Sequence, residues 1–368
     1  MNTTKKVQAE YKTKTFVLLR RSLSSLKATK LMTLLLAMLA LAACDSNDEP
    51  DYSKAPRIYM AIRDLYHGYV FDDKGNTIYE CPLNSVITKL ANEGKTWYAV
   101  RATGLDDGSV QYDLLRNGKT RFPLTDRVVS MCVVNGDVYT LQYRERRVPA
   151  EACFLIYKNE ELLYEYDANE HYFHSFDVVD GHLVAGIEES PYDYDKAIYW
   201  IDGKFHTYPS RDMICLESYA REGDNELLVF RYGNYFSESL SPYKYLFNGK
   251  LYELPNDFPT YQSMIVNGIP YIFGRHVNTT GQTSLIVNGV EYPISKHKPG
   301  GMKRYGDSVY ILVRDYNGPS KSYSQIFKLD EPIDMSADVS LKHLAYGEEN
   351  VVPLNMTYVE DFIVLPPK

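Results

Sequence analysis

Tryptophan is scarce in this sequence, with 2 Trp among 368 residues, and several structural signals are missing altogether. No segment after residue 43 shows a convincing apolar period of 3.6 residues, which argues against amphipathic helices there. No apolar run after residue 43 is long enough to span a bilayer, so the mature part is not an integral membrane protein. Hydrophobic residues still make up 45% of the chain, which excludes a fully disordered protein.

Cofactor and catalytic motifs are also missing. The 5 Cys include no CxxC pair, and the sequence has no GxSxG, HExxH, P-loop, dinucleotide-binding or sialidase Asp-box motif. His171 and His174 have metal-like spacing but no third ligand in sequence, so we expect neither a metal nor a cofactor. A glycosidase carboxylate pair needs only proximity in space, so the sequence leaves enzymatic activity open.

The first 43 residues have the pattern of an export signal. Eight Lys and Arg residues precede an apolar run at 31–43 (LMTLLLAMLALAA), which is too short for a spanning helix. The next residues, Leu41-Ala42-Ala43-Cys44, resemble a bacterial lipobox, which implies that Cys44 is lipidated as the first residue of the mature chain. The alternative is an ordinary cleavable signal with a chance cysteine.

An acidic segment follows at 45–50 (DSNDEP). It resembles the export signal of surface lipoproteins of the Bacteroidetes, which implies an outer-membrane lipoprotein displayed on the cell surface. A flexible spacer on a periplasm-facing anchor is the alternative. We therefore expect a signal peptide at 1–43, a tether at 44–55 and a folded domain at 56–368.

The mature chain is acidic. Residues 1–43 contain eight basic residues and one acid, so 32 Lys and Arg remain against 47 Asp and Glu, a net charge of about −15. A negatively charged protein repels the phosphate backbone, so we expect no nucleic-acid partner.

Two hairpin patterns alternate along residues 56–368. One pairs two strands around a Gly-containing turn, with its centre at residues 75, 118, 160, 203, 249, 289 and, in degraded form, 330. The other has its centre at residues 94, 136, 181, 224, 268, 307 and 361. Asn-Gly and Asp-Gly turns between Val-, Ile- and Tyr-rich strands are strong hairpin signals, because both central residues need a positive φ.

Four short strands every forty-odd residues resemble the blade of a β-propeller, as in WD-repeat and kelch proteins, although neither signature sequence is present. The resemblance implies an all-β, seven-bladed propeller of four-stranded antiparallel blades. Six or eight blades and a β-solenoid are alternatives. The C-terminal segment 350–361 is expected to supply the first strand that residues 57–82 lack. One strand is then redundant, because residues 57–64 and 362–368 both fit the second position.

In such a blade the two tight turns lie on one face, and the longer, variable connections lie on the other. Binding residues concentrate in variable loops on a rigid scaffold, so we expect the ligand face to be the second one. Near the start of each innermost strand a small or polar residue recurs, which we attribute to crowding at the centre; these residues are Thr88, Ser130, Ser175, Ser218, Gln262, Gly301 and Asn355.

An arginine recurs at the end of the second strand of nearly every unit, and together these residues would form a basic ring: Arg63, Arg101, Arg144, Arg231, Arg275 and Arg314. Guanidinium groups there could grip a carboxylate, sulfate or phosphate. The alternative is structural, with each arginine bridging to a carboxylate or carbonyl of a neighbouring blade.

The remaining candidate residues lie in or next to the variable loops. Glu188 replaces arginine in one unit and is either an acid site or a partner for neighbouring arginines. Tyr192, Tyr194 and Tyr235 are candidate platforms for a sugar ring.

These observations predict a lipid-anchored envelope binding module for an acidic glycan, a glycan-uptake partner or another envelope protein. The alternatives are a polysaccharide lyase or glycosidase acting on an acidic sugar, and a structural scaffold protein.

Overall fold

The structure is a computed structural model of the whole chain. It describes residues 55–63, 67–145, 152–179, 181–189, 198–207, 213–232, 242–277, 281–315, 323–329, 341–344 and 358–367. All regular structure in these ranges is β-strand, and no helix among them is long and apolar enough to cross a membrane.

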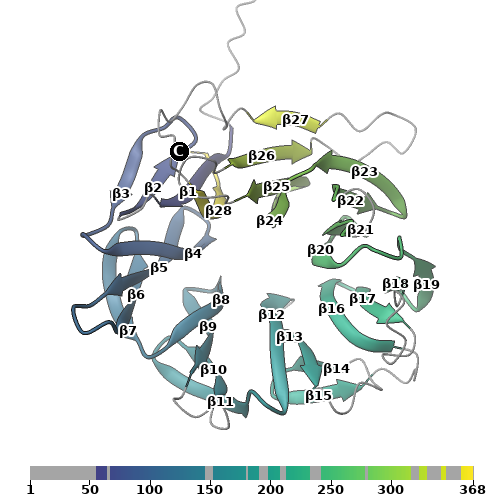
Figure 1. Cartoon of the computed structure of the whole chain (residues 1–368), viewed down its shortest axis with the longest axis horizontal. Coiled ribbons are helices and arrows are strands. Elements are labelled where there is room, and N and C mark those ends of the chain that lie inside the picture. Colours follow the sequence, from purple (N-terminus) through teal and green to yellow (C-terminus); the bar gives the residue numbers. More distant parts are fainter. Residues whose placement is uncertain are drawn as a thin grey trace, which may run out of the picture. The chain divides into compact units, whose positions relative to one another are not determined.

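Seven four-stranded antiparallel sheets are arranged around a ring in the unit Pro56–Lys368 (Figure 1), which confirms the seven-bladed propeller. Blade 1 consists of β28 (Tyr358–Leu365), β1 (Arg57–Arg63), β2 (Gly68–Asp72) and β3 (Thr77–Glu80). Blade 2 consists of β4 (Ser85–Glu93), β5 (Thr96–Gly104), β6 (Val110–Arg116) and β7 (Lys119–Leu124). Blade 3 consists of β8 (Arg127–Val134), β9 (Asp137–Arg144), β10 (Cys153–Lys158) and β11 (Glu161–Asp167). Blade 4 consists of β12 (His171–Val179), β13 (His182–Glu189), β14 (Ile198–Ile201) and β15 (Lys204–Thr207).

Blades 5 to 7 continue in chain order. Blade 5 consists of β16 (Met213–Glu222), β17 (Asn225–Tyr232), β18 (Tyr243–Phe247) and β19 (Lys250–Glu253). Blade 6 consists of β20 (Thr260–Val266), β21 (Ile269–Arg275), β22 (Thr283–Val287) and β23 (Val290–Ser295). Blade 7 consists of β24 (Lys298–Tyr305), β25 (Ser308–Asp315), β26 (Tyr323–Leu329) and β27 (Leu341–Leu344). The first strand of each sheet is innermost, and neighbouring innermost strands contact each other all the way around, including β24 with β28 and β28 with β4.

Blade 1 joins the two ends of the folded region. The C-terminal strand β28 is innermost and pairs along the whole of β1, from Arg57 opposite Leu365 to Arg63 opposite Tyr358. The predicted hairpin centred on Asp361 is therefore wrong: residues 358–365 form one strand with a bulge at Glu360. This also removes the surplus strand, because the segment after Asp361 is the second half of β28.

The other degraded hairpin differs as well. The partner of β26 is β27, with Leu329 opposite Leu341, rather than a strand immediately after Asp330. Asp330 and Asn355 both lie outside the described residues.

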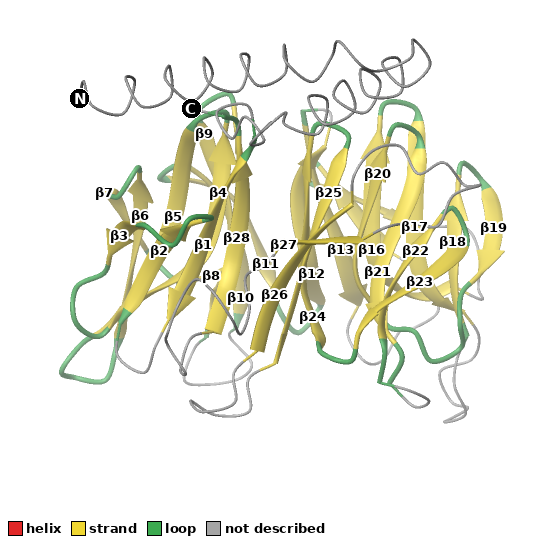
Figure 2. Ribbon diagram, turned by 90° about the horizontal axis from the view of Figure 1, so that it is seen from above, coloured by secondary structure: helices red, strands yellow, loops and turns green. Residues whose placement is uncertain are grey.

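The tight turns have the predicted chemistry. Both central residues have positive φ at Asn117-Gly118, Asn135-Gly136, Asp202-Gly203, Asn248-Gly249, Asn267-Gly268 and Asn288-Gly289. At Asn117 the side chain also accepts a hydrogen bond from the backbone N–H of Trp97 (3.0 Å), which extends the pairing between the second and third strands. Because the strands alternate in direction, these turns share one face of the ring, the turn face, and the longer connections share the other, the loop face (Figure 2).

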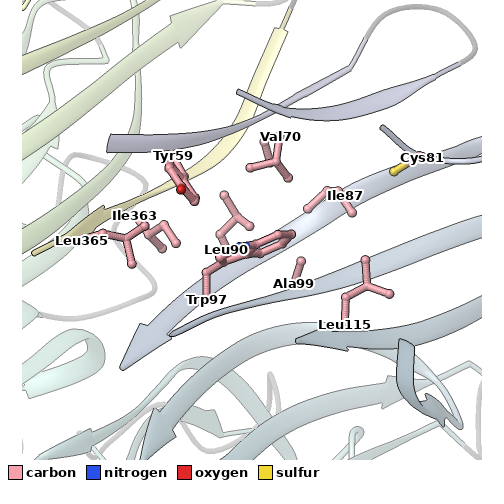
Figure 3. Packing of buried hydrophobic residues seen from close by; sticks show 11 residues of the cluster. Tyr59, Val70, Cys81, Ile87, Leu90, Trp97, Ala99, Leu115, Ile363 and Leu365 are labelled. Atoms are coloured by element: carbon pink, nitrogen blue, oxygen red, sulfur yellow. The ribbon is translucent and has the colours of Figure 1, made fainter. Parts of the chain in front are cut away.

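Apolar side chains pack between neighbouring blades. Between blades 1 and 2, Trp97 meets Tyr59 edge-on with the ring centroids 6.3 Å apart, and Ile363 and Leu365 of β28 join the same cluster (Figure 3). Trp97 and Trp200 are both buried. Cys81, Cys132 and Cys153 are buried, and none of them forms a disulfide.

Every innermost strand carries a β-bulge near its loop-face end. The bulged residues are Thr88, Val129, His174, Glu217, Tyr261, Gly300 and Glu360. The next residue in each strand belongs to what we call the inner row: Lys89, Ser130, Ser175, Ser218, Gln262, Gly301 and Asp361. A bulge re-aims the side chains that flank it. Four inner-row side chains bond to the backbone of a neighbouring blade: Ser130, Ser218, Gln262 and Asp361.

Candidate functional surface on the loop face

The recurrent arginines lie in the second strands of their blades, toward the loop face. Arg63 is in β1, and the others are Arg101 in β5, Arg144 in β9, Arg231 in β17, Arg275 in β21 and Arg314 in β25. The repeat thus brings them to equivalent positions of six blades, on the second strand rather than on the innermost one.

Two of these arginines are paired with acids of their own blade. Arg101 donates from Nη2 to Asp113 Oδ2 at 2.6 Å and from Nη1 to the hydroxyl of Tyr79 in blade 1. The Arg144 Nε and Nη2 atoms both donate to Asp126, with Nη2 2.9 Å from Oδ2. The Asp126 carboxylate raises the pKa of Arg144 against the effect of burial.

Three more arginines are paired with acids at the bulges. Arg231 Nε lies 2.9 Å from Glu217 Oε1, and Arg63 Nε lies 2.6 Å from Glu360 Oε1. Arg314 of blade 7 donates to the carbonyl oxygens of Val359 and Glu360 in β28 and thereby ties blade 7 to blade 1. These contacts are of the kind expected from the structural alternative for the ring.

The remaining candidate residues from the sequence have side chains outside the part that the structure describes. Glu188 lies in β13 opposite Tyr172, and its side chain is outside the described part. Tyr192, Tyr194, Tyr235 and Cys44 also fall outside the residues that the structure describes.

Arg275 differs from the other five. Its Nε donates to the carbonyl oxygen of Gly281 at 3.0 Å, and its Nη2 donates to that of Lys296 at 3.3 Å. Among the described residues no carboxylate pairs with it. Carbonyl oxygens position a guanidinium but carry no full negative charge, so Arg275 keeps its net positive charge.

Arg275 and Tyr261 contact neighbouring parts of the chain at 296–300, which comprises the connection from β23 to β24 and the first residues of β24. The bulge at Tyr261 leaves its ring 50% exposed, edge-on to Phe273, with the hydroxyl 3.4 Å from the carbonyl oxygen of Gly300. Two exposed lysines, Lys296 and Lys298, lie in this stretch. We call Tyr261, Arg275, Lys296 and Lys298 the blade-6 patch.

Both acids of blade 6 are bound by one histidine. Residues 254–301 contain two acids, Asp257 and Glu291, against three Lys and Arg residues. His276 links both acids: Nδ1 lies 2.7 Å from Asp257 Oδ1, and Nε2 lies 2.8 Å from Glu291 Oε1. Burial lowers the pKa of His276, but the two carboxylates outweigh it and the net pKa is raised. The blade-6 patch is therefore locally cationic on an acidic protein.

Sequence reasoning found Arg275 but missed the rest of this patch. The signal was present: residues 254–301 contain only two acids, and Lys296-His297-Lys298 follows the last strand of blade 6. No group of three metal-ligating side chains occurs in the described ranges.

No protein family and no curated protein matches the sequence. Solved structures do match the fold. The β-propeller domain of the trilobed protease from Pyrococcus furiosus aligns with a TM-score of 0.52 at 13% identity, over 81% of this chain and 97% of that one. An acylaminoacyl peptidase aligns with a TM-score of 0.51 at 12% identity, over 79% of this chain, which spans 52% of that chain's length. At such identities the likeness establishes the β-propeller fold alone.

Proposed function

We propose that this protein is a lipid-anchored envelope binding module, displayed on the outer membrane through Cys44, whose blade-6 patch binds an acidic glycan. The leader, the lipobox-like segment and the acidic tether support the anchor. The observation that carries the ligand class is Arg275, which has no carboxylate partner among the described residues and lies beside an exposed tyrosine and two exposed lysines.

The patch suits an acidic sugar chain in two ways. Guanidinium and ammonium groups make charge-assisted hydrogen bonds to uronate carboxylates or sulfate esters. The face of Tyr261 offers an apolar surface on which a sugar ring can stack. Because the cations are exposed, their attraction to a polyanion weakens as salt rises.

The chemistry of the patch favours binding without turnover. His276 directly follows Arg275, and both of its ring nitrogens are engaged by carboxylates. A histidine in that state has no nitrogen left to accept a proton from a ligand. Blade 6 thus supplies positive charge and contact area for the ligand, whereas His276 stabilises the fold by bridging two carboxylates.

The test measures binding of alginate, a polyuronate, to the full chain by isothermal titration calorimetry, with neutral dextran as the control ligand. Arg275→Ala and Lys296→Ala should each weaken alginate binding about 10-fold, since a charged hydrogen bond contributes about 1.5–3 kcal/mol. Lys119→Ala removes an exposed lysine on the turn face and should change nothing. Equal alginate affinity in wild type and Arg275→Ala, with equal thermal stability, would overturn the proposal.

A further inference from the structure

The chain enters the folded unit at the turn face. β1 starts at Arg57, opposite Leu365 at the end of β28, and it ends at Arg63 beside the loop-face connection to β2. Arg57 and Leu365 therefore both lie at the turn-face end of blade 1. The segment that precedes β1 is joined to this side of the ring.

The chain between Cys44 and the folded unit is short. From Cys44 to Pro56 it has twelve residue steps, which span at most about 40 Å when fully extended. Passing along the seven residues of β1 to the loop face would take roughly 23 Å of that length, since a strand rises about 3.3 Å per residue. Such extension costs conformational entropy. A lipid attached at Cys44 would therefore hold the turn face, rather than the loop face, next to a bilayer.

Exposed cations gather at the turn-face end of blade 2, which neighbours blade 1 in the ring (Figure 1). Lys95 lies in the turn between β4 and β5. Arg116 and Lys119 lie opposite each other where β6 meets β7, and Arg121 follows two residues later. All four side chains are exposed, and none forms an ion pair with another described residue. We call Lys95, Arg116, Lys119 and Arg121 the blade-2 turn patch.

Two buried rings lie beneath the guanidinium groups of this patch. The Cζ atom of Arg116 is 5.9 Å from the centroid of the Tyr98 ring, and that of Arg121 is 5.5 Å from the centroid of the Phe122 ring. Both rings are buried. They are thus unavailable for stacking on a sugar, unlike the half-exposed Tyr261 of the blade-6 patch. The blade-2 turn patch offers positive charge without a sugar platform.

The positive charge is local to blade 2. The turn-face end of this blade, residues 93–98 and 115–122, contains four basic residues and one acid, Glu93. Glu93 Oε2 accepts the backbone N–H of Gly136 in blade 3 at 2.7 Å. The one acid of this end therefore serves the contact between blades.

Blade 3, on the other side of the patch, is acidic at its turn-face end. Residues 134–139 and 156–162 contain one basic residue, Lys158, against Asp137, Glu160 and Glu161. Lys158 Nζ lies 2.9 Å from Asp137 Oδ2, and the more distant charge of Arg121 acts on the same carboxylate. Arg121 is thus partly compensated, whereas Lys95, Arg116 and Lys119 are left for an external anion.

We propose that the turn face rests on the membrane and that the blade-2 turn patch binds the phosphate groups of anionic phospholipids. This inference rests on the proposed anchor at Cys44 and adds the face that meets the lipid. Ammonium and guanidinium groups donate charge-assisted hydrogen bonds to phosphate oxygens. Each cation near an anionic bilayer surface contributes about fivefold in affinity. The loop face, with the blade-6 patch, then points away from the bilayer toward a soluble glycan.

Fluorescence quenching tests the orientation. A fluorophore is attached at Thr120→Cys, beside the patch, or at Asp106→Cys, in the loop-face connection of the same blade; both positions are exposed. The nine residues of β5 separate these two ends by roughly 30 Å. The full chain is reconstituted into vesicles of phosphatidylethanolamine and phosphatidylglycerol that contain a headgroup-bound nitroxide, and labelling of the unsubstituted chain gives the background.

We expect quenching at Thr120→Cys and only background quenching at Asp106→Cys, because a headgroup nitroxide acts over a short range. Equal quenching at the two positions, or stronger quenching at Asp106→Cys, would overturn the orientation.

Removal of charge tests the patch itself. A fourfold variant with Lys95→Gln, Arg116→Gln, Lys119→Gln and Arg121→Gln should reduce the quenching at Thr120→Cys to about half or less. Phosphatidylcholine vesicles, or high salt, should do the same to the unmutated patch. Lys296→Gln with Lys298→Gln, on the loop face, is the matched control and should change nothing. If the fourfold variant unfolds normally in urea and is quenched as strongly as the unmutated patch, the patch does not bind lipid.

Cys44→Ser separates this inference from the anchor on which it rests. In cells that express the full chain, this variant should move from the membrane pellet to the soluble fraction. If it stays in the pellet, the anchor is wrong, whereas the quenching pattern still decides which face meets the lipid. If it leaves the pellet but the quenching pattern is reversed, the anchor stands and the orientation is wrong.

Discussion

A single histidine of blade 6 contacts both acids of that blade. His276 lies between Asp257 and Glu291, and Phe258 packs against its ring with the centroids 5.1 Å apart. Protonated, the imidazole satisfies both carboxylates; neutral, it can donate to one of them, and the other is left beside a lone pair. Protonation of His276 therefore decides whether both carboxylates have a donor.

We predict that His276 makes stability depend on pH. Its pKa is raised in the folded protein above the unfolded value near 6.5, so its contribution is complete below about pH 6.5 and disappears as pH rises through the raised pKa. Urea unfolding at a series of pH values should show His276→Gln less stable than wild type at low pH, with the difference shrinking at high pH. A difference independent of pH would contradict this assignment.

The arginine repeat shows what sequence can and cannot give at the residue scale. Recurrence at equivalent positions was visible, because the turns fix the register. The partners were not, since they come from different elements: Asp113 from a third strand, Asp126 from a loop, Glu217 from a bulge and Glu360 from another blade. The charge state of each guanidinium thus depends on contacts that no local pattern encodes.

The recurring element is an innermost strand whose bulge directs an inner-row side chain to the next blade. Gln262 Oε1 accepts the N–H of Met302 at 2.8 Å, and Ser218 Oγ accepts that of Ser263 at 3.0 Å. Ser130 uses the same position to donate to the carbonyl oxygen of Phe176 at 3.0 Å. These bonds replace ladder hydrogen bonds, because the inner edge of a propeller blade has no further strand to pair with.

The inner-row bonds predict a clear cost for Gln262→Ala. The N–H of the buried Met302 would lose its acceptor, which should lower the free energy of unfolding by about 1–3 kcal/mol. Gln262→Glu keeps an acceptor oxygen and should recover part of the loss. Urea unfolding measures both; a Gln262→Ala variant as stable as wild type would show that water replaces the bond.

At the scale of strands and turns, the sequence located the tight turns whose residues require a positive φ and misplaced a turn where no such requirement exists. Asn-Gly and Asp-Gly sites located the tight turns correctly, since positive φ is a local requirement. Asp361 was interpreted as a turn because a polar pair, Glu360-Asp361, interrupts an apolar pattern. In the structure the bulge absorbs Glu360, and the polarity of Asp361 serves the next blade. The recurrence of small or polar residues holds at Ser130, Ser218, Gln262 and Gly301, whereas the inner-row residues of blades 2 and 1 are Lys89 and Asp361 rather than Thr88 and Asn355. At Ser130, Ser218 and Gln262 the position serves interblade hydrogen bonding.

At the scale of the whole molecule, β28 determines whether the ring closes. Its side chains alternate between two neighbours, as strand geometry requires. Phe362 and Val364 pack with Tyr310 and Leu312 of blade 7, whereas Ile363 and Leu365 belong to the cluster shared with blade 2. Eight residues from the C-terminal end of the chain therefore connect three blades.

We predict that Phe362→Ala lowers the free energy of unfolding by about 3–5 kcal/mol, as expected for deletion of a buried phenylalanine ring. Phe362 is fully buried, whereas Leu251, at the same type of apolar position on an outermost strand, is 42% exposed. Leu251→Ala is therefore the matched control, with an expected cost of about 1 kcal/mol or less. Urea unfolding followed by tyrosine fluorescence measures both variants.

Removal of residues 358–368 would delete the whole of β28. The shortened chain would expose the inner edge of β1 and the apolar faces of blades 2 and 7 together, so we expect it to aggregate or to lose cooperative unfolding. A synthetic peptide of residues 358–368 should restore the native transition when added in excess, and a scrambled peptide should not. If the shortened chain unfolds cooperatively near the wild-type midpoint without peptide, then the ring does not require β28, and the cost of Phe362→Ala must be local.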